Sequence, residues 1–266
     1  MPILEFLGTG NAFLPQGRFH SLLLLDDSIL IDCPPTALAS LRRINISPRD
    51  INSILFTHWH GDHYFGFPFL ILERKWISDR EGNRELGIHG PSACKKRLAE
   101  LCELAYPGSV GDRLDSFKWS EEEQGGVQCS PHWSFERFEV KHEIEVDPHG
   151  YIMTHESGLK FMHTGDSGPC EAISSRAGDC DVVVMEMGVP EEVDIPQHFR
   201  PSTVATLANA NPETIFLVTH TWLDEPNCER EPIISNQLPQ LPDNVIQVSD
   251  GDRFILNSEG LQRSNK

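Results

Sequence analysis

The sequence predicts a layered α/β fold, with β-sheets at the centre and helices on their outer faces. Short apolar runs bounded by Gly, Pro and Asp recur along the whole chain, which is the pattern of strands separated by turns. Longer segments with helix start signals lie between several of these runs. A chain of 266 residues, 39% of them hydrophobic, is long enough to bury the core that such layers require.

The first part of the chain alternates expected strands with two expected helices. Residues 35–43 suit a helix, and Pro91 marks the start of a second helix that continues to about Tyr106. Pro107 and Gly108 then end it. We expect strands at residues 3–7, 21–25, 28–32, 51–57 and 86–89.

Residues 107–130 interrupt this pattern. From Gly111 to Gln128 the sequence loses periodicity and carries a Glu-Glu-Glu run and paired glycines, so we expect a surface loop or lid. Helices follow at about 169–177 and 201–210, and we expect strands at 134–140, 142–146, 151–155, 159–163, 181–186, 215–218 and 245–248. Because no repeat or low-complexity linker divides the chain, we treat residues 1–266 as a single domain.

Composition narrows the possible partners and the compartment. A formal net charge of −18 argues against long RNA or DNA, because nucleic-acid affinity rests largely on Lys and Arg neutralising phosphates. The longest apolar runs are too short to span a bilayer, and the N-terminus lacks the basic leader of a secretory signal. Seven scattered cysteines without a C-x-x-C pair suggest reduced thiols. We therefore expect a cytoplasmic protein.

Four potential metal ligands fall within six residues after the apolar run 51–57. They are His58, His60, Asp62 and His63, and Gly61 supplies the backbone freedom for a bend between them. At the end of a strand, positions i and i+2 point to one side, while i+4 and i+5 face a second point nearby. The segment therefore favours a metal site over a solvated loop.

This segment resembles a known signature. THWHGDHYFGFPFL is similar to the HxHxDH motif of metallo-β-lactamase-fold hydrolases, and especially to their tRNase Z (ribonuclease Z) branch. The opening FLGTGNAFLPQGRFHSLLLL followed by LIDC is also similar to that branch, which places Asp32 where it would support the metal ligands. The resemblance implies a four-layer αββα sandwich, with metals at the edge where strand-end loops converge, and a possible homodimer.

Three further ligands follow in the order that the family implies. His142, Asp166 and His220 each end or follow an apolar strand. By resemblance, His58, His60 and His142 would hold one divalent metal ion, Asp62, His63 and His220 would hold the other, and Asp166 would bridge them. Two such ions lower the pKa of a shared water, which implies hydrolysis by a metal-bridging hydroxide. Zn²⁺ is the default, although imidazole and carboxylate ligands also accept Mn²⁺ or Fe.

Asp62, His198 and Glu186 are the residues for which we expect catalytic roles. His198-Phe199-Arg200-Pro201 resembles the histidine loop that precedes the last ligand in tRNase Z-like phosphodiesterases. An imidazole there would act as general acid, with Glu186 orienting it. The alternative is that His198 only caps the helix that starts at Pro201.

The interval between His142 and Asp166 bears on the substrate. Bacterial tRNase Z enzymes place their protruding tRNA-binding arm here, but this chain has only 23 residues, which suit a hairpin-like pair of strands. We therefore expect a small phosphodiester as substrate, such as a cyclic nucleotide, a cyclic phosphate or a short RNA end. Processing of tRNA 3′ ends is a weaker hypothesis than hydrolysis of a small phosphodiester.

The main alternative is acyl hydrolysis of a lactone, thioester or β-lactam by the same metal centre. Its pocket would be formed by Trp59, Tyr64, Phe65, Phe67 and Trp222, which otherwise would be core or lid residues. A non-catalytic metal-binding module is disfavoured because every ligand is present.

His20 could touch substrate, but a turn hydrogen bond explains it equally well. The histidines that fit no ligand position are His89, His132, His149, His155 and His163.

Overall fold

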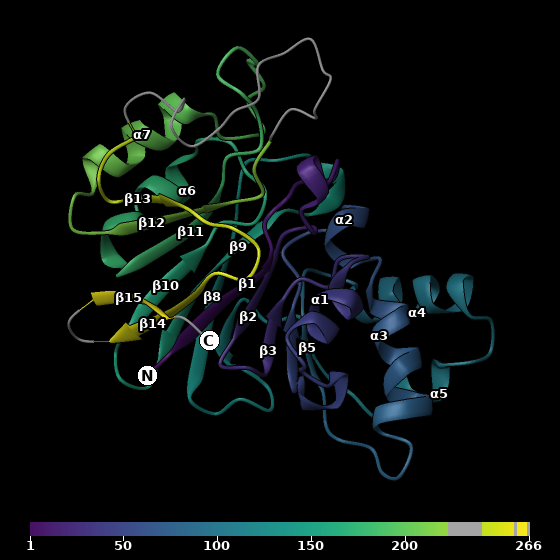
Figure 1. Ribbon diagram of the computed structural model, residues 1–266. Coiled ribbons are helices and arrows are strands. Elements are labelled where there is room, and N and C mark those ends of the chain that lie inside the picture. Colours follow the sequence, from purple (N-terminus) through teal and green to yellow (C-terminus); the bar gives the residue numbers. More distant parts are fainter. Residues whose placement is uncertain (223–240, 258–259, 265–266) are drawn as a thin grey trace.

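A computed structural model describes residues 1–222, 241–257 and 260–264 of the chain. It contains two β-sheets that pack face to face, with helices on both outer sides (Figure 1). This arrangement is the predicted four-layer αββα sandwich, and the prediction is confirmed. No helix in the described part of the chain has the length and apolar character needed to cross a membrane.

The first sheet is built mainly from the N-terminal half. Its strand order is β15-β14-β1-β2-β3-β4-β5-β6, with antiparallel pairing from β15 to β3 and parallel pairing from β3 to β6. The strands are β1 (Ile3–Gly8), β2 (Leu22–Leu25), β3 (Ile29–Ile31), β4 (Ser53–Leu55), β5 (Gly87–His89), β6 (Lys118–Ser120), β14 (Arg253–Asn257) and β15 (Gly260–Ser264).

The second sheet follows the order β13-β12-β11-β10-β9-β8-β7. Strands β10 to β13 run parallel, and β7 to β10 pair antiparallel. The strands are β7 (Gln124–Gly126), β8 (Trp133–Glu139), β9 (His149–His155), β10 (Lys160–His163), β11 (Val182–Glu186), β12 (Ile215–Thr219) and β13 (Val245–Gln247).

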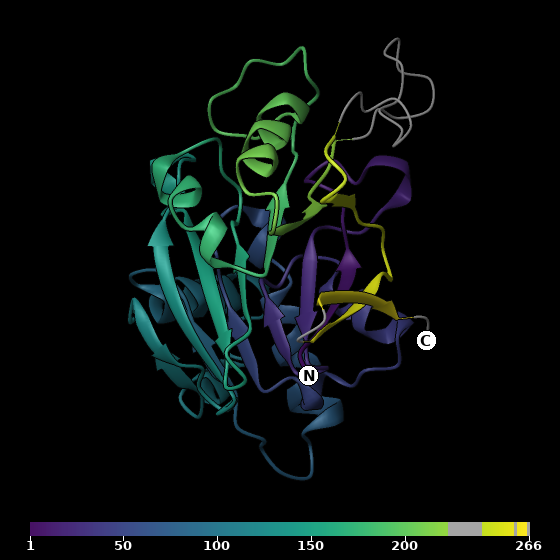
Figure 2. The same ribbon diagram turned by 90° about the vertical axis from the view of Figure 1, so that its left-hand side faces the viewer.

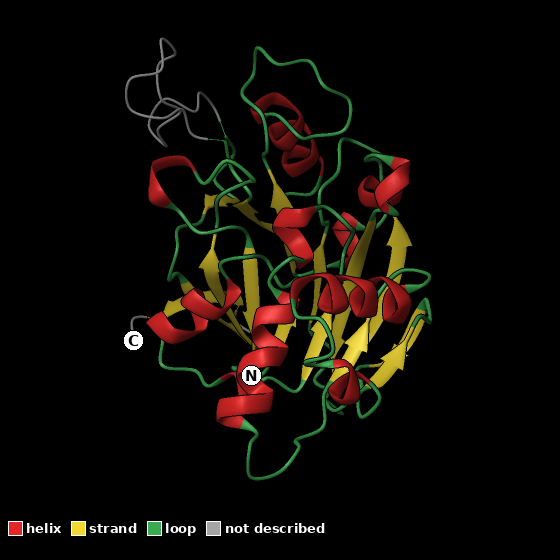
Figure 3. Ribbon diagram, turned by 90° about the vertical axis from the view of Figure 1, so that its right-hand side faces the viewer, coloured by secondary structure: helices red, strands yellow, loops and turns green. Residues whose placement is uncertain are grey.

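Three apolar cores separate the four layers. Between the sheets lie side chains such as Phe6, Tyr151 and Phe161, all fully buried. A second core joins the first sheet to α1 (Ala37–Arg43), α3 (Phe67–Glu73) and α4 (Cys94–Ala105), which lie in front of the strands in Figure 3. The third core joins the second sheet to α6 (Glu171–Ser174) and α7 (Pro201–Ala210), seen in Figure 2.

The remaining helical turns are short. They are α2 (Gly61–Tyr64), α5 (Gly111–Leu114), the π-helical turn η3 (Arg74–Ser78), and the 3₁₀ turns η1 (Pro15–Gly17), η2 (Pro48–Asp50), η4 (Ile144–Val146) and η5 (Ala177–Asp179).

Two sequence-based expectations need correction. Residues 107–130 do not form a plain loop: they contain α5, β6 and β7, and the last two strands extend one edge of each sheet. Their low apolar content reflects edge strands that are largely exposed. Residues 142–146 do not form a strand but end in the turn η4, because the chain leaves the sheet after β8. The pair β9 and β10 occupies the rest of the interval to Asp166, as predicted.

The topology brings several strand ends to one edge. The parallel strands β10, β11 and β12 all end at the same side of the second sheet: β10 shortly before Asp166, β11 at Glu186 and β12 directly before His220. Strand β4 of the first sheet ends shortly before His58. The polar residues after these strands therefore meet at one rim of the sandwich.

Candidate metal centre

Two groups of potential metal ligands lie side by side at this rim. One contains His58, His60, His142 and Asp166, whose ligand atoms all lie within 4.8 Å of one another. Within it, Nε2 of His142 lies 3.1 Å from Nδ1 of His60. The other group contains Asp62, His63 and His220, under the same distance criterion. The structure thus brings together all seven residues that were expected as ligands, in the grouping that the resemblance implied.

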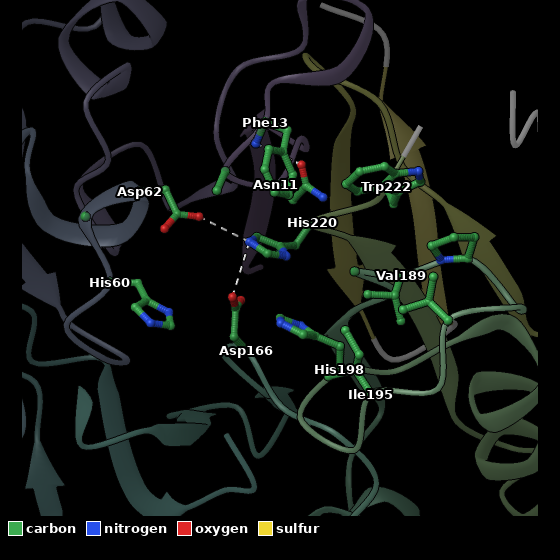
Figure 4. Close-up of a pocket in the computed structure, with 15 residues that line it drawn as sticks. Asn11, Phe13, His60, Asp62, Asp166, Val189, Ile195, His198, His220 and Trp222 are labelled. Carbon is green, nitrogen blue, oxygen red and sulfur yellow. Dashed lines mark hydrogen bonds and ion pairs between the residues drawn. The ribbon is translucent and has the colours of Figure 1, made fainter. Parts of the chain in front are cut away.

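Asp166 lies between the two groups. Its carboxylate is 3.8 Å from Nε2 of His58, 3.4 Å from Nε2 of His63 and 3.3 Å from Nε2 of His220. Figure 4 shows Asp166 below His220 and Asp62 to its left, and both carboxylates contact the same ring nitrogen, Nε2 of His220. Oδ2 contacts His58 of one group and His220 of the other, and Oδ1 contacts His63, so the carboxylate lies next to ligand atoms of both groups.

The seven side chains fit metal ions. The Nε2 atoms of His58 and His63 are buried and have no hydrogen-bond partner, although both face the clusters. Buried polar atoms are rarely left unpaired without a reason, and a metal ion would satisfy both lone pairs. Burial lowers the pKa of His58 well below its usual value, which keeps this imidazole neutral, as a ligand must be. The His/Asp groups are therefore consistent with a dinuclear metal site.

Asp32 holds the site from behind. Its carboxylate accepts hydrogen bonds from Nδ1 of His63 at 2.8 Å and from the backbone N–H of Thr57 at 2.8 Å. The bond to Nδ1 directs Nε2 of His63 towards the ligand groups. Asp32 itself adopts a positive φ of 69°, a conformation that is held only where the surroundings over-determine it.

His198 and Glu186 form a pair beside the ligand groups. Nδ1 of His198 donates to Oε1 of Glu186 at 2.7 Å, and a third group of close ligand atoms joins both residues to Asp166. Burial would lower the pKa of His198, but the Glu186 carboxylate raises it to about 9. His198 does not cap α7, because Arg200 is the capping residue and bonds with Thr203. The capping alternative is wrong.

Gly188 makes room for this pair. A Cβ atom at this position would lie 2.5 Å from Oε2 of Glu186 and 3.0 Å from Nδ1 of His198. The backbone N–H of Gly188 instead donates to Oε2 at 2.7 Å, and that of Ser167 donates to Oε1 at 2.9 Å. Glu186 is thus fully engaged and 1% exposed, so its side chain has a fixed position.

A cavity of about 1000 Å³ opens onto the ligand groups. One part of its lining is polar and belongs to the centre described above, including Asp62, Asp166 and His198 (Figure 4). Another part is largely apolar and was not anticipated from the sequence, apart from Trp222. It consists of Asn11, Ala12, Phe13, Val189, Pro190, Val193, Ile195 and Trp222. No residue of 107–130 lines it, so the expected lid does not cover the site in the described structure.

The aromatic residues proposed for an acyl pocket mostly lie elsewhere. Trp59, Tyr64 and Phe67 are buried in the core beneath the first sheet, while Trp222 lines the cavity.

Nδ1 of His20 lies 3.4 Å from the hydroxyl oxygen of Thr36. The six described cysteines are free thiols, and Cys228 lies outside the described residues. The other histidines belong to neither ligand group: His89, His132, His149, His155 and His163.

Residues 3–221 match the family model of the anti-Pycsar protein Apyc1. The chain belongs to this Apyc1 family. The match spans the HxHxDH-like segment and reaches past His220, so all seven potential ligands and the His198–Glu186 pair lie within it. Membership supports the prediction of a metal-dependent hydrolase.

Relatives of this Apyc1-family chain include ribonuclease Z enzymes. That of Pyrobaculum calidifontis is 23% identical over 96% of this chain and 99% of its own length. That of Pediococcus pentosaceus is 41% identical, but over 35% of this chain and 31% of its own. The predicted relation to the ribonuclease Z branch is confirmed.

Solved structures confirm the metallo-β-lactamase fold. The metallo-β-lactamase fold protein YhfI from Bacillus subtilis superposes with a TM-score of 0.70 at 15% identity, covering 95% of this chain and 98% of that one. The short form of human tRNase Z superposes with a TM-score of 0.66 at 22% identity, covering 82% and 92%.

Proposed function

We propose that this protein is a metal-dependent phosphodiesterase that hydrolyses a small cyclic nucleotide to a nucleoside monophosphate. The observation that carries the proposal is the His198–Glu186 pair, which lies at the cavity next to Asp166. Such a pair supplies a proton donor beside a centre suited to phosphoryl chemistry. Membership of the Apyc1 family and similarity to ribonuclease Z enzymes support the same reaction class.

The seven His and Asp residues would hold two divalent metal ions, for which we propose Zn²⁺, with Mn²⁺ or Fe as alternatives. His58, His60 and His142 would bind one ion, Asp62, His63 and His220 the other, and Asp166 both. When bound, a pair of such ions acidifies water and stabilises charge on the phosphoryl oxygens. Three carboxylates near His63, those of Asp166, Asp62 and Asp32, outweigh its burial and raise its pKa, so binding of a metal ion at Nε2 would release a proton.

The remaining chemistry falls to His198 and Glu186. Hydrolysis adds water at phosphorus and breaks one ester P–O bond of the cyclic phosphate, and the leaving oxygen must then receive a proton. His198 can supply it from Nε2, because Glu186 holds Nδ1 and thereby fixes the ring. Its imidazole ring lies 4.9 Å from that of His142 and 6.5 Å from that of His220, centroid to centroid, so the ring lies beside both ligand groups.

A small substrate is supported by the interval from His142 to Asp166. It contains a turn and the strand pair β9 and β10, which extend the sheet and do not protrude as an arm. The cavity of about 1000 Å³ is large enough for a mononucleotide, and the net charge of −18 disfavours a long polyanion.

The proposal is tested by product analysis. Purified protein of known metal content is incubated with 3′,5′-cyclic nucleotides and, in parallel, with a tRNA precursor, and products are separated by chromatography and gel electrophoresis. We expect nucleoside monophosphates from the former and intact tRNA precursor from the latter. Cleavage of the tRNA precursor with intact cyclic nucleotides would overturn the proposal.

A further inference from the structure

The cavity has a second functional wall besides the metal groups. Asn11, Phe13 and Trp222 form one side of it, and Figure 4 places them together above His220, away from Asp166 and His198. Val189 and Ile195 of the loop before α7 also line the cavity. A ligand whose phosphate lay at the metal groups would therefore extend along an aromatic and aliphatic surface.

Asn11 carries an unused hydrogen-bond donor on this wall. Its side chain is 4% exposed, and Oδ1 accepts the backbone N–H of Phe13 at 3.0 Å. This bond fixes which end of the amide is oxygen, so Nδ2 must point the other way. Within the described residues Nδ2 has no acceptor, although the side chain lines the cavity. A side-chain amide N–H group at a cavity wall can donate to a ligand that supplies an acceptor.

Phe13 and Trp222 add an aromatic surface. Their ring centroids lie 5.1 Å apart at an interplanar angle of 76°, an edge-to-face arrangement. Phe13 lines the cavity and is nevertheless 68% exposed, so its side chain is accessible to a ligand. Planar heterocycles, including every nucleobase, can stack on aromatic side chains through the faces of their rings.

The backbone ties this wall to the metal groups. Gly10 forms β-bridges with both His20 and Thr221, and the N–H of Thr221 donates to the carbonyl oxygen of Thr9 at 3.0 Å. Asn11 follows Gly10 in the chain, and His220 and Trp222 lie on either side of Thr221. All three are therefore next to the paired backbone of Gly10 and Thr221. The distance between the wall and His220 is set by these bonds and does not depend on a mobile side chain.

We propose that Asn11, Phe13 and Trp222 form a nucleobase subsite that positions the substrate, a step that rests on the proposed function. The base stacks against Phe13 and Trp222, and Nδ2 of Asn11 donates to an acceptor atom on its edge. Recognition of the base adds affinity, and it orients the cyclic phosphate towards His198. The same wall disfavours phosphodiesters that lack a planar heterocycle.

The first test uses the unmodified protein and two substrates. A 3′,5′-cyclic nucleotide is compared with 1-O-methylribose 3′,5′-cyclic phosphate, which has the same scissile bonds but no base. We expect kcat/KM at least about tenfold higher for the nucleotide, through a lower KM. Equal values would overturn the base subsite and leave the proposed function standing. Hydrolysis of neither compound would remove both.

The second test uses variants of the wall. Phe13→Ala removes an exposed ring, and Asn11→Asp keeps the acceptor for the N–H of Phe13 but replaces the Nδ2 donor. Each is expected to raise KM for the nucleotide about tenfold. The matched control is Leu104→Ala, since Leu104 is 82% exposed on α4. Equal losses on the nucleotide and on the base-free compound would contradict recognition of the base.

Discussion

His198 and Glu186 lie 2.7 Å apart, from Nδ1 to Oε1, and this hydrogen bond links the loop before α7 to the end of strand β11. The Glu186 carboxylate also accepts the backbone N–H groups of Ser167 and Gly188. Ser167 directly follows Asp166, so one carboxylate fixes the position of His198 and of the segment that carries Asp166. The proton donor and the metal groups are thereby held in register.

Replacing His198 with Gln should lower turnover of a cyclic nucleotide about a hundredfold or more, because general acid catalysis typically contributes that much. Metal content should stay at two ions per chain, since none of the seven proposed ligands is changed. Steady-state kinetics together with elemental analysis measures both. Full activity in His198→Gln would show that the leaving oxygen receives its proton elsewhere.

Glu186→Gln tests the positioning role separately. Glutamine has one acceptor oxygen, so it cannot accept N–H groups on both sides as the carboxylate does for Gly188 and Ser167. We expect a reduced kcat. We also expect the alkaline limb of the pH profile of kcat to show a lower pKa, because the carboxylate that raises the pKa of His198 is lost. A profile identical to that of the parent protein would contradict this role.

Asp166→Asn should reduce the metal content itself. The carboxylate contacts Nε2 atoms on both sides, and an amide is a weaker ligand that lacks the negative charge. Elemental analysis after dialysis against a low concentration of chelator measures the effect. Asp50→Asn is the matched control, because Asp50 forms an exposed ion pair with Arg84. Retention of two ions and full activity in Asp166→Asn would exclude the bridging assignment.

Asp32→Asn should weaken metal binding about 10- to 100-fold, as is usual when the partner of a ligating histidine is changed. The reason is that Nδ1 of His63 donates to Oδ2, and an amide nitrogen at that position cannot accept this bond. Competition with a chromophoric chelator measures the affinity. An unchanged affinity would mean that packing alone orients His63.

His89 should make stability depend on pH. Burial lowers its pKa to about 4 from an unfolded value of about 6.5, so the folded state resists protonation. The free energy of unfolding that neutral His89 contributes is fully present above about pH 6.5. It falls by up to about 3 kcal/mol as the pH decreases towards 4. Urea unfolding across this range, for the parent protein and His89→Gln, measures the difference. Parallel pH curves for the two proteins would refute this origin.

The sequence was informative where chemistry is local. Four ligands lie within His58 to His63, and the other three follow apolar strands in the order that the family resemblance implies, so their meeting could be predicted. Glu186 and His198 were found through the resemblance to tRNase Z-like phosphodiesterases. The register of parallel strands explains the success, because their carboxyl ends must share one edge.

The apolar wall could not be predicted because its members come from distant segments with no common pattern. Asn11 and Phe13 lie in an N-terminal loop that meets Trp222 through the bridge between Gly10 and Thr221 and through the contact of the Phe13 and Trp222 rings. Strands β6, β7, β14 and β15, which lie at or next to the edges of the sheets, were missed for a related reason. Half-exposed edge residues lack the apolar run that marks a central strand.

The central claim is that this site cleaves a phosphodiester. It is tested most directly by measuring kcat/KM of metal-quantified protein, loaded separately with Zn²⁺ and Mn²⁺, on a 3′,5′-cyclic nucleotide, a lactone and a chromogenic β-lactam. We predict turnover of the cyclic nucleotide that falls at least about a hundredfold in His198→Gln while two metal ions remain bound. Preferential turnover of the lactone or the β-lactam, unchanged in His198→Gln, would contradict the account.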